Sequence, residues 1–373
     1  MLTPREVVSE FSGAFADLGT FLPIVLAVLS LRQMDPTGLL MGFGLFALAV
    51  ALIYRRPIPI QPMKVVAAMV IAGQLDPATI AASGFLLGII LLLLGLSGWI
   101  DRLAEKLPQT LLQGIQIGVG LYLVWGGVNL MQDQWLLGLS LFLLLFLLQG
   151  TRLKSYTVLL LILAFTSWPL ISASHYPDIE VGIYLPALSA FDWPDLWHST
   201  TAVLFPQMAL TLTNAVVVTA AIAGQMFPQD RSRITPKRLA LSTGSLNLLL
   251  APLGAFPMCH GAGGLVVQHR FGARTGLTPA IFGTSCLLLG LFLGPDAIKL
   301  LQLVPVSAVG ALLVFAGLHL AVDKKLRHTD RWKLTVILLT AISCLLFNMA
   351  VGLFVGLAAE TLRVRLIAKI KPS

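Results

Sequence analysis

Charged residues are scarce in this chain of 373 residues, where Asp, Glu, Lys and Arg together make up only 11%. In an ordinary soluble domain roughly a quarter of the residues are charged. Hydrophobic residues account for 57% of the chain, and its mean hydropathy is +0.88. So few charges exclude an ordinary soluble domain and indicate an integral membrane protein.

Cysteine is also rare, and the usual catalytic patterns are missing. The three cysteines, Cys259, Cys286 and Cys344, lie in apolar stretches, which argues against a disulfide framework. The sequence has no paired carboxylates, no metal-ligand spacing and no nucleophile motif. We therefore expect neither an enzyme nor a metal site, and we expect no cofactor.

Apolar runs predict an all-α protein with fourteen candidate membrane spans. Several runs are too short to cross a membrane alone, notably 58–74, 257–270 and the pair near 332–364. The runs cover residues 11–30, 36–54, 58–74, 78–100, 108–130, 135–150, 156–172, 200–226, 236–254, 257–270, 278–294, 298–322, 332–347 and 349–364.

The net charge of +8 follows the loops between these runs. If the N-terminus is cytoplasmic and the spans alternate, the loop Lys and Arg residues fall on the cytoplasmic side, except Arg32 and Lys299. The longest loop, 173–199, has four acidic residues and no Lys or Arg, as expected outside the cell. We predict a protein of the cytoplasmic (inner) membrane with both termini cytoplasmic, surrounded by lipid and without a nucleic-acid partner.

Similar proline-containing motifs recur in the two halves of the chain. RRPIPIQPMK at 55–64 is echoed by AFPMCH at 255–260, and LPQTLLQG by VPVSAVG further on. Because seven spans is an odd number, the second half would enter the membrane from the opposite side. Such inverted repeats are typical of secondary transporters, and interrupted spans at matching positions mark their binding sites.

The interruptions themselves predict an anion-binding site. The prolines of residues 57–62 predict an extended segment followed by a helix from about Met63, and Pro257 predicts the same for 255–259. Irregular backbone at membrane depth is tolerated where it is buried in protein or lines a wet cavity. Helix N-termini favour anions, so two of them near the membrane midplane would form an anion cradle.

Glycines follow the second interruption. Gly261, Gly263 and Gly264 would leave backbone N–H groups open to close approach by a ligand. In a merely packed helix, each would cost about 1 kcal/mol relative to Ala.

Ionisable residues inside the spans are few and are candidates for function. Lys64 either snorkels to the cytoplasmic face, pairs with Asp17 or meets the substrate. His260 is either a satisfied core histidine, an anion donor or a proton-coupling group. Cys259 fits a small packing residue better than a soft ligand.

A polar cluster lies in the first span of each half. Gln207, Thr211 and Asn214 are spaced by four and three residues, which places them on one helical face. Either they bond neighbouring helices or they line the cavity. The matching span of the first half presents Asp17 and Thr20 near Gly19.

Four stretches resemble a known family. FADLGTFLPIVLAV, PIPIQPMK, LTLTNAVVVTAAIAGQMFP and NLLLAPLGAFPMCHGAGGLVVQHRFGARTG are similar to signature stretches of the molybdate transporter family, a branch of the sulfate permease superfamily. The resemblance runs from about residue 11 to 360. It implies seven plus seven inverted spans, a core domain that moves like an elevator against a gate domain, and substrate between the starts of spans 3 and 10.

The resemblance also implies domain limits. The first repeat would cover 1–172, an external loop 173–199, and the second repeat 200–373. The core domain would comprise about 8–104 and 200–296, and the gate domain about 105–172 and 297–366. We expect no cytosolic regulatory domain after the last span, unlike many sulfate permeases.

The site residues form one set. The family pattern implies most of them, and the helical face of the eighth span adds Thr211. The predicted substrate-binding residues are Asp17, Gly19, Thr20, Gln61, Met63, Lys64, Gln207, Thr211, Asn214, Cys259, His260, Gly261, Ala262 and Gly263.

The resulting hypothesis is a secondary active transporter of molybdate. Sulfate and tungstate stay open as substrates, and Asp17 or His260 would carry a coupled proton in a symport. The alternatives are a nucleobase or bicarbonate carrier of the same fold, or a channel. The chain is either a monomer or a homodimer.

Overall fold

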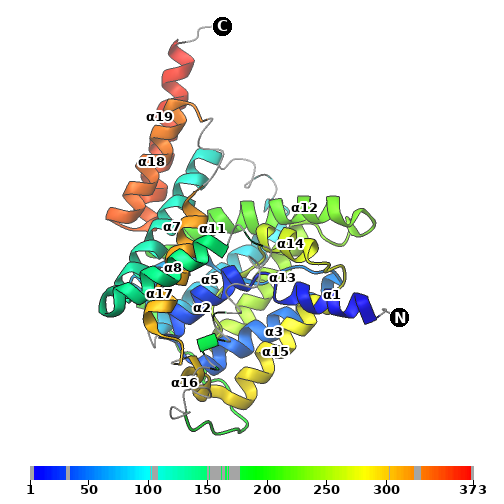
Figure 1. Ribbon diagram of the computed structural model, residues 1–373. Coiled ribbons are helices and arrows are strands. Elements are labelled where there is room, and N and C mark those ends of the chain that lie inside the picture. Colours follow the sequence, from blue (N-terminus) through cyan, green and yellow to red (C-terminus); the bar gives the residue numbers. More distant parts are fainter. Residues whose placement is uncertain are drawn as a thin grey trace.

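The computed structural model describes residues 4–30, 34–100, 102, 108–148, 151, 161, 164–165, 167, 177–301, 303–322 and 329–370. These residues are mostly helical, and the predicted all-α fold is confirmed (Figure 1). The predicted span at 156–172 lies almost wholly outside the described residues.

The helices follow the predicted apolar runs closely. Two short strands, β1 (Gln61–Pro62) and β2 (Met258–Cys259), fall at the predicted interruptions. The main helices are α1 (Pro4–Ala14), α2 (Leu18–Ser30), α3 (Pro36–Tyr54), α4 (Lys64–Ile71), α5 (Pro77–Ser97), α7 (Gln109–Met131), α8 (Trp135–Leu148), α10 (Trp193–Ser199), α11 (Phe205–Leu210), α12 (Thr219–Met226), α13 (Pro236–Leu250), α14 (Ala262–Arg270), α15 (Leu277–Leu293), α16 (Ala297–Leu301), α17 (Val306–Ala321), α18 (Arg331–Leu346) and α19 (Met349–Ile370).

Among the described residues, five helical stretches are long and apolar enough to cross a membrane. They are Pro36–Tyr54, Pro77–Ser97, Gln109–Leu148, Trp193–Met226 and Leu277–Leu300. The third combines α7 and α8 through the short 3-10 turn η1 (Gln132–Gln134), where the sequence predicts two separate spans. The fourth contains two π-helical segments, η2 (Thr200–Leu204) and η3 (Thr211–Val218), which the sequence pattern does not predict.

Local sequence explains where the long helices begin. Asp35 accepts hydrogen bonds from the N–H groups of Thr37 and Gly38, and Asp76 accepts one from Thr79. In both cases a proline follows at the first helical position, where its missing N–H costs nothing. These caps fix the starts of α3 and α5 on the two sides of the first interruption.

Helices of the first half pack against helices of the second half. The main pairs are α3 with α15, α5 with α13 and α7 with α17. At the α5–α13 contact a Cβ on Gly88 would lie 2.9 Å from the Gly244 carbonyl oxygen, and a Cβ on Gly244 would lie 2.9 Å from that of Gly88. Small residues of this kind let membrane helices approach backbone to backbone. The two halves are therefore interleaved rather than stacked as separate units.

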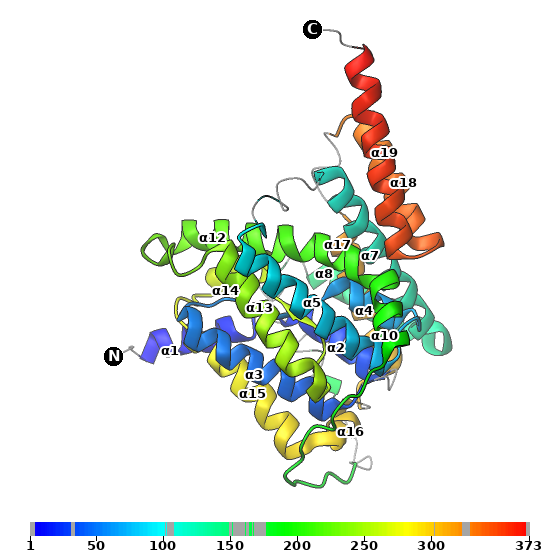
Figure 2. The ribbon, with the colours of Figure 1, turned by 180° about the vertical axis from the view of Figure 1, so that it is seen from behind.

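Helices α18 and α19 lie to one side of this bundle. α18 packs against α7 and α19, and the pair of α18 and α19 projects beyond the other helices in both ribbon views (Figures 1 and 2).

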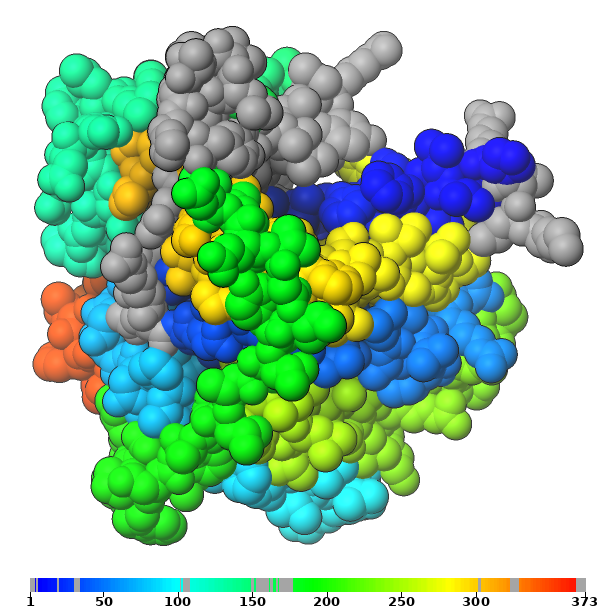
Figure 3. All heavy atoms as spheres, turned by 90° about the horizontal axis from the view of Figure 1, so that it is seen from below, coloured from blue at the N-terminus to red at the C-terminus, as the bar shows by residue number. Residues whose placement is uncertain are grey.

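The segment before α10 lies across α15 and α16, as the space-filling view shows in green over yellow (Figure 3). Backbone bonds hold it there, from Gly182 N–H to the Phe292 carbonyl (3.1 Å) and from Tyr184 N–H to the Leu291 carbonyl (2.8 Å).

Candidate functional site

The two predicted interruptions lie side by side. β1 pairs with β2 in antiparallel register, with Gln61 opposite Cys259 and Pro62 opposite Met258. The N–H of Met63 then donates to the Pro257 carbonyl at 2.9 Å. Segments almost two hundred residues apart thus meet through their backbones. The sequence predicts the two extended segments, whereas their direct pairing is visible only in the structure.

Each strand leads directly into a helix start. The N-cap residues are Met63 for α4 and Gly261 for α14, and neither start has a side-chain cap of its own. At α4 the Val65 N–H donates to Gln207 Oε1 at 2.9 Å. At α14 the N–H groups of Gly263 and Gly264 have no acceptor among the described residues. The second start therefore keeps backbone donors for a ligand.

A cavity of about 740 Å³ opens beside these helix starts. Its walls come from the α1–α2 turn, the two interruptions, the α11–η3 region, and from α7 and α17. Nine of the predicted residues line it, namely Asp17, Thr20, Gln61, Lys64, Gln207, Thr211, Asn214, Cys259 and Gly263. The cavity is ample for a tetrahedral oxyanion with some of its water.

Asp17, Gln61 and Lys64 form one hydrogen-bonded chain. Lys64 Nζ donates to Gln61 Oε1 at 3.1 Å, and Gln61 Nε2 donates to Asp17 Oδ2 at 2.5 Å. No direct ion pair between Asp17 and Lys64 appears among the described residues. Since Gln61 uses its acceptor on Lys64 and a donor on Asp17, the amide holds both charged groups at the cavity wall.

Two glycines make room for this chain. A Cβ on Gly261 would overlap the Gln61 amide, and a Cβ on Gly264 would lie 2.5 Å from Asp17 Oδ2. A Cβ on Gly263 would meet nothing within 4 Å. Of the three glycines in the predicted cradle, only Gly263 could carry a Cβ without meeting another group, while the other two are required by side chains from the first half.

The polar cluster of the eighth predicted span makes two kinds of contact. Gln207 Nε2 donates to Thr211 Oγ1 at 2.9 Å while its oxygen accepts from Val65, so Gln207 also closes the start of α4. Asn214 lines the cavity with an exposed side chain. This cluster therefore bonds a neighbouring helix and also borders the cavity.

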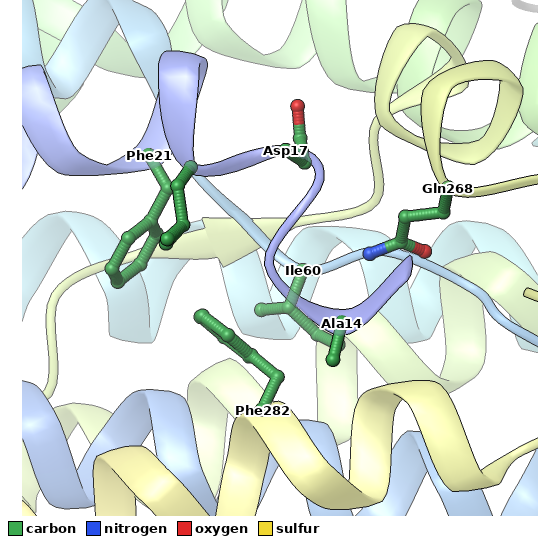
Figure 4. Close-up of a pocket in the computed structure, with 7 residues that line it drawn as sticks. Ala14, Asp17, Phe21, Ile60, Gln268 and Phe282 are labelled. Carbon is green, nitrogen blue, oxygen red and sulfur yellow. The ribbon is translucent and has the colours of Figure 1, made fainter. Parts of the chain in front are cut away.

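A second, much smaller cavity lies behind Asp17. Its volume is about 10 Å³, close to the smallest space that holds a water molecule. Figure 4 shows Phe21, Phe282, Ile60 and Ala14 around it, with the Asp17 carboxylate directed away from them. This apolar packing supports the unwound turn between α1 and α2, at which Asp17 sits.

His260 is turned away from the large cavity. Its ring is 1% exposed, and Nδ1 faces the Pro59 carbonyl at 3.2 Å, a contact in which the nitrogen must donate. On the other side Nε2 lies 3.4 Å from Ser242 Oγ, which is 2.6 Å from the Tyr54 hydroxyl. The structure thus places His260 in a buried network that holds the first extended segment, in line with the core-histidine alternative.

The other predicted residues lie close to the cavity without lining it. Met63 is fully buried, and Gly261 and Ala262 are the N-cap and the first residue of α14. Gly19 lies in the first turn of α2.

Asn247 supports the second interruption from outside the predicted set. Its amide accepts from the Met258 N–H at 2.8 Å and donates to the Met258 carbonyl at 2.6 Å. Pro62, the partner of Met258 in the register, has no N–H to offer that carbonyl. Asn247 supplies the missing donor, and it is the first residue of the longest stretch that carries the family resemblance.

The site residues predicted from the sequence do not include the part of the cavity wall that α7 and α17 form. Gln109, Gln113 and Gln116 of α7 and His319 of α17 all line it. The spacing of the three glutamines on an otherwise apolar helix was the available signal.

Comparisons with known proteins identify the family of this chain. A family model described as "Molybdate transporter of MFS superfamily" matches residues 9–123 and 199–320, well over half of the chain. Molybdate transporter 2 of Arabidopsis thaliana is 29% identical over 403 aligned positions, which cover 93% of this chain and 85% of that protein.

Two solved structures share the fold. The transmembrane domain of the cyanobacterial bicarbonate transporter BicA matches with a TM-score of 0.68 at 16% identity, over 95% of this chain and 98% of that one. Murine Solute Carrier 26 family member A9, an anion transporter in the inward-facing state, matches with a TM-score of 0.71 at 12% identity, over 99% and 70%. The predicted resemblance is confirmed: this chain is a multi-pass membrane protein that belongs to the molybdate transporter family.

Proposed function

We propose that this protein is a secondary active transporter that carries molybdate across the cytoplasmic membrane. The observation that carries the proposal is the pair of antiparallel interruptions whose helix starts open on one cavity beside Lys64. The curated relative named as a molybdate transporter supports the choice of substrate.

The cavity offers the donors that a tetrahedral dianion needs. Lys64 supplies a positive charge, the start of α14 supplies the N–H groups of Gly263 and Gly264, and Thr211 and Asn214 supply hydroxyl and amide groups. Hydrogen bonds to an ionised acceptor are stronger than neutral ones. Sulfate and tungstate carry the same charge and shape, so selection among the three would depend on the space between these donors.

The architecture supports an inverted repeat. The helix pairs α3–α15 and α5–α13 relate the second predicted span of each half to the fourth span of the other. We assign residues 1–172 and 200–373 to the two repeats, 173–199 to an external loop, and both termini to the cytoplasm. The core would comprise about 8–104 and 200–296, and the gate about 105–172 and 297–366.

Transport would follow from movement of the core along the gate. Both charged residues that line the cavity, Asp17 and Lys64, belong to the core, whereas the gate contributes uncharged and apolar residues together with His319. The anion would therefore travel with the core, as in an elevator. Whether two chains associate stays a prediction.

Uptake of a dianion needs an energy source. Moving two negative charges inward costs about 4.6 kcal/mol per 100 mV of a negative interior. Asp17 is the stronger candidate for a coupled proton, because it lines the cavity while His260 does not. Protonation of Asp17 would remove a negative charge from the wall just when the anion binds.

The test is uptake of radiolabelled molybdate into proteoliposomes with and without an imposed pH gradient. Saturable uptake that sulfate or tungstate reduces, and that uracil does not, supports the proposal. Competition by uracil alone would indicate a nucleobase carrier, and ohmic currents in a bilayer recording would indicate a channel.

A further inference from the structure

A row of glutamines on α7 lines the same cavity as Lys64. Gln109, Gln113 and Gln116 are spaced by four and three residues, so they share one face of α7, and all three border the cavity. His319, in the last turn of α17, borders it beside them. Polar side chains in membrane helices face the protein interior or water, which is where these lie.

One member of this row also joins two helices. Gln116 Nε2 donates to the Leu320 carbonyl at 3.1 Å and so ties α7 to α17. An amide nitrogen has two protons, so this bond leaves Gln116 a second donor. All three glutamines line the cavity, whatever other groups they also contact.

The row extends toward one side of the membrane. Gln109 is the first residue of α7 and follows a segment with Arg102 and Lys106, while α17 ends shortly before Lys324 and Lys325. By the preference of Lys and Arg for cytoplasmic loops, both helix ends are cytoplasmic. From Gln116 to Gln109 the row spans about 10 Å along the helix axis. The cavity therefore leads from the core groups toward the cytoplasm.

We propose that Gln109, Gln113, Gln116 and His319 form a second oxyanion subsite on the gate wall, which the anion occupies between Lys64 and the cytoplasm. This inference rests on the proposed function and adds a binding step to it.

The uncharged donors of this wall suit weak and brief binding of the anion. Glutamine amides donate to oxyanion oxygens without a full positive charge, so they bind a dianion more weakly than Lys64 does. A conducting path needs sites that attract the ion but release it readily. Because the gate wall faces the core only where the cavity is open, the subsite serves the cytoplasmic step of transport and not the external one.

The experiment compares the two faces of the membrane. Molybdate uptake is measured in right-side-out and inside-out membrane vesicles for the wild type and for the double variant Gln113→Leu, Gln116→Leu. We expect the KM on the cytoplasmic face to rise about tenfold, which corresponds to the loss of one or two charge-assisted hydrogen bonds. The KM on the external face should stay within about twofold.

Matched variants secure the interpretation. Gln132→Leu makes the same change at the other end of α7, where Gln132 is exposed and bonds only Asn129 among the described residues, and it should alter neither KM. Gln113→Glu keeps the size of the side chain and adds a negative charge, so it should raise the cytoplasmic KM further. This variant also tests the subsite if the double variant does not reach the membrane.

Two results overturn the subsite. An unchanged cytoplasmic KM in these variants shows that the glutamines do not contact the anion, and an equal rise on both faces places them in the main site or in the fold. The proposed function fails separately, through wild-type vesicles that show no saturable molybdate uptake in either orientation, and the subsite for molybdate then falls with it.

Discussion

The two interruptions have matching backbones but different chemistry. The first, around Gln61 and Lys64, brings polar and charged side chains to the cavity. The second, from Cys259 to Gly264, brings small side chains and open N–H groups, while His260 faces away from the cavity. The two segments thus share one backbone arrangement but differ in chemistry, since one supplies charge and the other supplies space.

The interruptions also depend on one another. The start of α4 is closed by Gln207 from the second half, and the start of α14 is packed against Gln61 and Asp17 from the first half. Each half therefore shapes the site of the other. Changes near the two interruptions should therefore have unequal effects, and the following variants are given in order of expected size.

Lys64→Ala should have the largest effect. It removes the positive charge that lines the cavity and leaves Gln61 and Asp17 without their partner, which costs about 3 kcal/mol or more. We expect molybdate uptake, measured as Vmax/KM in proteoliposomes, to fall at least about a hundredfold. Lys299→Ala, which removes an exposed lysine paired with Asp296, is the control and should leave uptake unchanged. Normal uptake by Lys64→Ala would remove this residue from the site.

Gly264→Ala and Gly263→Ala form a matched pair one residue apart. The new Cβ at 264 would press on Asp17 Oδ2 and Gln61 Nε2, whereas the one at 263 meets open space. Overpacking of this kind costs about 1–3 kcal/mol, so Gly264→Ala should lower uptake about ten- to a hundredfold. Gly263→Ala should change it about threefold at most. Equal loss in both would show that the Asp17–Gln61 contact does not set the geometry of the site.

Asp17→Asn separates binding from proton coupling. Asparagine can still accept the Gln61 hydrogen bond but carries no titratable proton. One coupled proton adds about 1.4 kcal/mol per unit of pH gradient, or a tenfold accumulation, and this gain should vanish in the variant. His260→Ala should retain the pH response, because the ring lies in the Tyr54–Ser242 network. A flat pH profile in His260→Ala together with a normal one in Asp17→Asn would reverse the assignment.

Asn247→Ala should mainly affect stability. It leaves the buried N–H and carbonyl of Met258 without partners, at about 1–3 kcal/mol each. We expect the detergent-solubilised protein to unfold about 5 °C lower in a thermal assay. Asn214→Ala removes an asparagine exposed in the cavity and should lower uptake without changing the unfolding temperature. Equal unfolding temperatures for the two variants would show that Asn247 does not support the second interruption.

Much of the fold was predictable from the sequence. Long apolar runs must become helices in lipid, because each backbone group needs an internal partner there, and the observed helices follow those runs. Proline clusters must break such helices, and β1 and β2 lie where Pro62 and Pro257 indicate. The identity of many lining residues followed from the family resemblance of the same stretches.

The tertiary structure decided which way the side chains of the site point and which distant residues they contact. The sequence places His260 and Cys259 side by side, but only the packed fold turns the His260 ring toward Tyr54 and leaves Cys259 at the cavity wall. Likewise Gly264 is a glycine because Asp17, more than two hundred residues away, occupies the space of its Cβ. Local chemistry fixes where a membrane helix starts and stops, since its backbone bonds are local, whereas a cavity is the space left between segments whose meeting no single segment encodes.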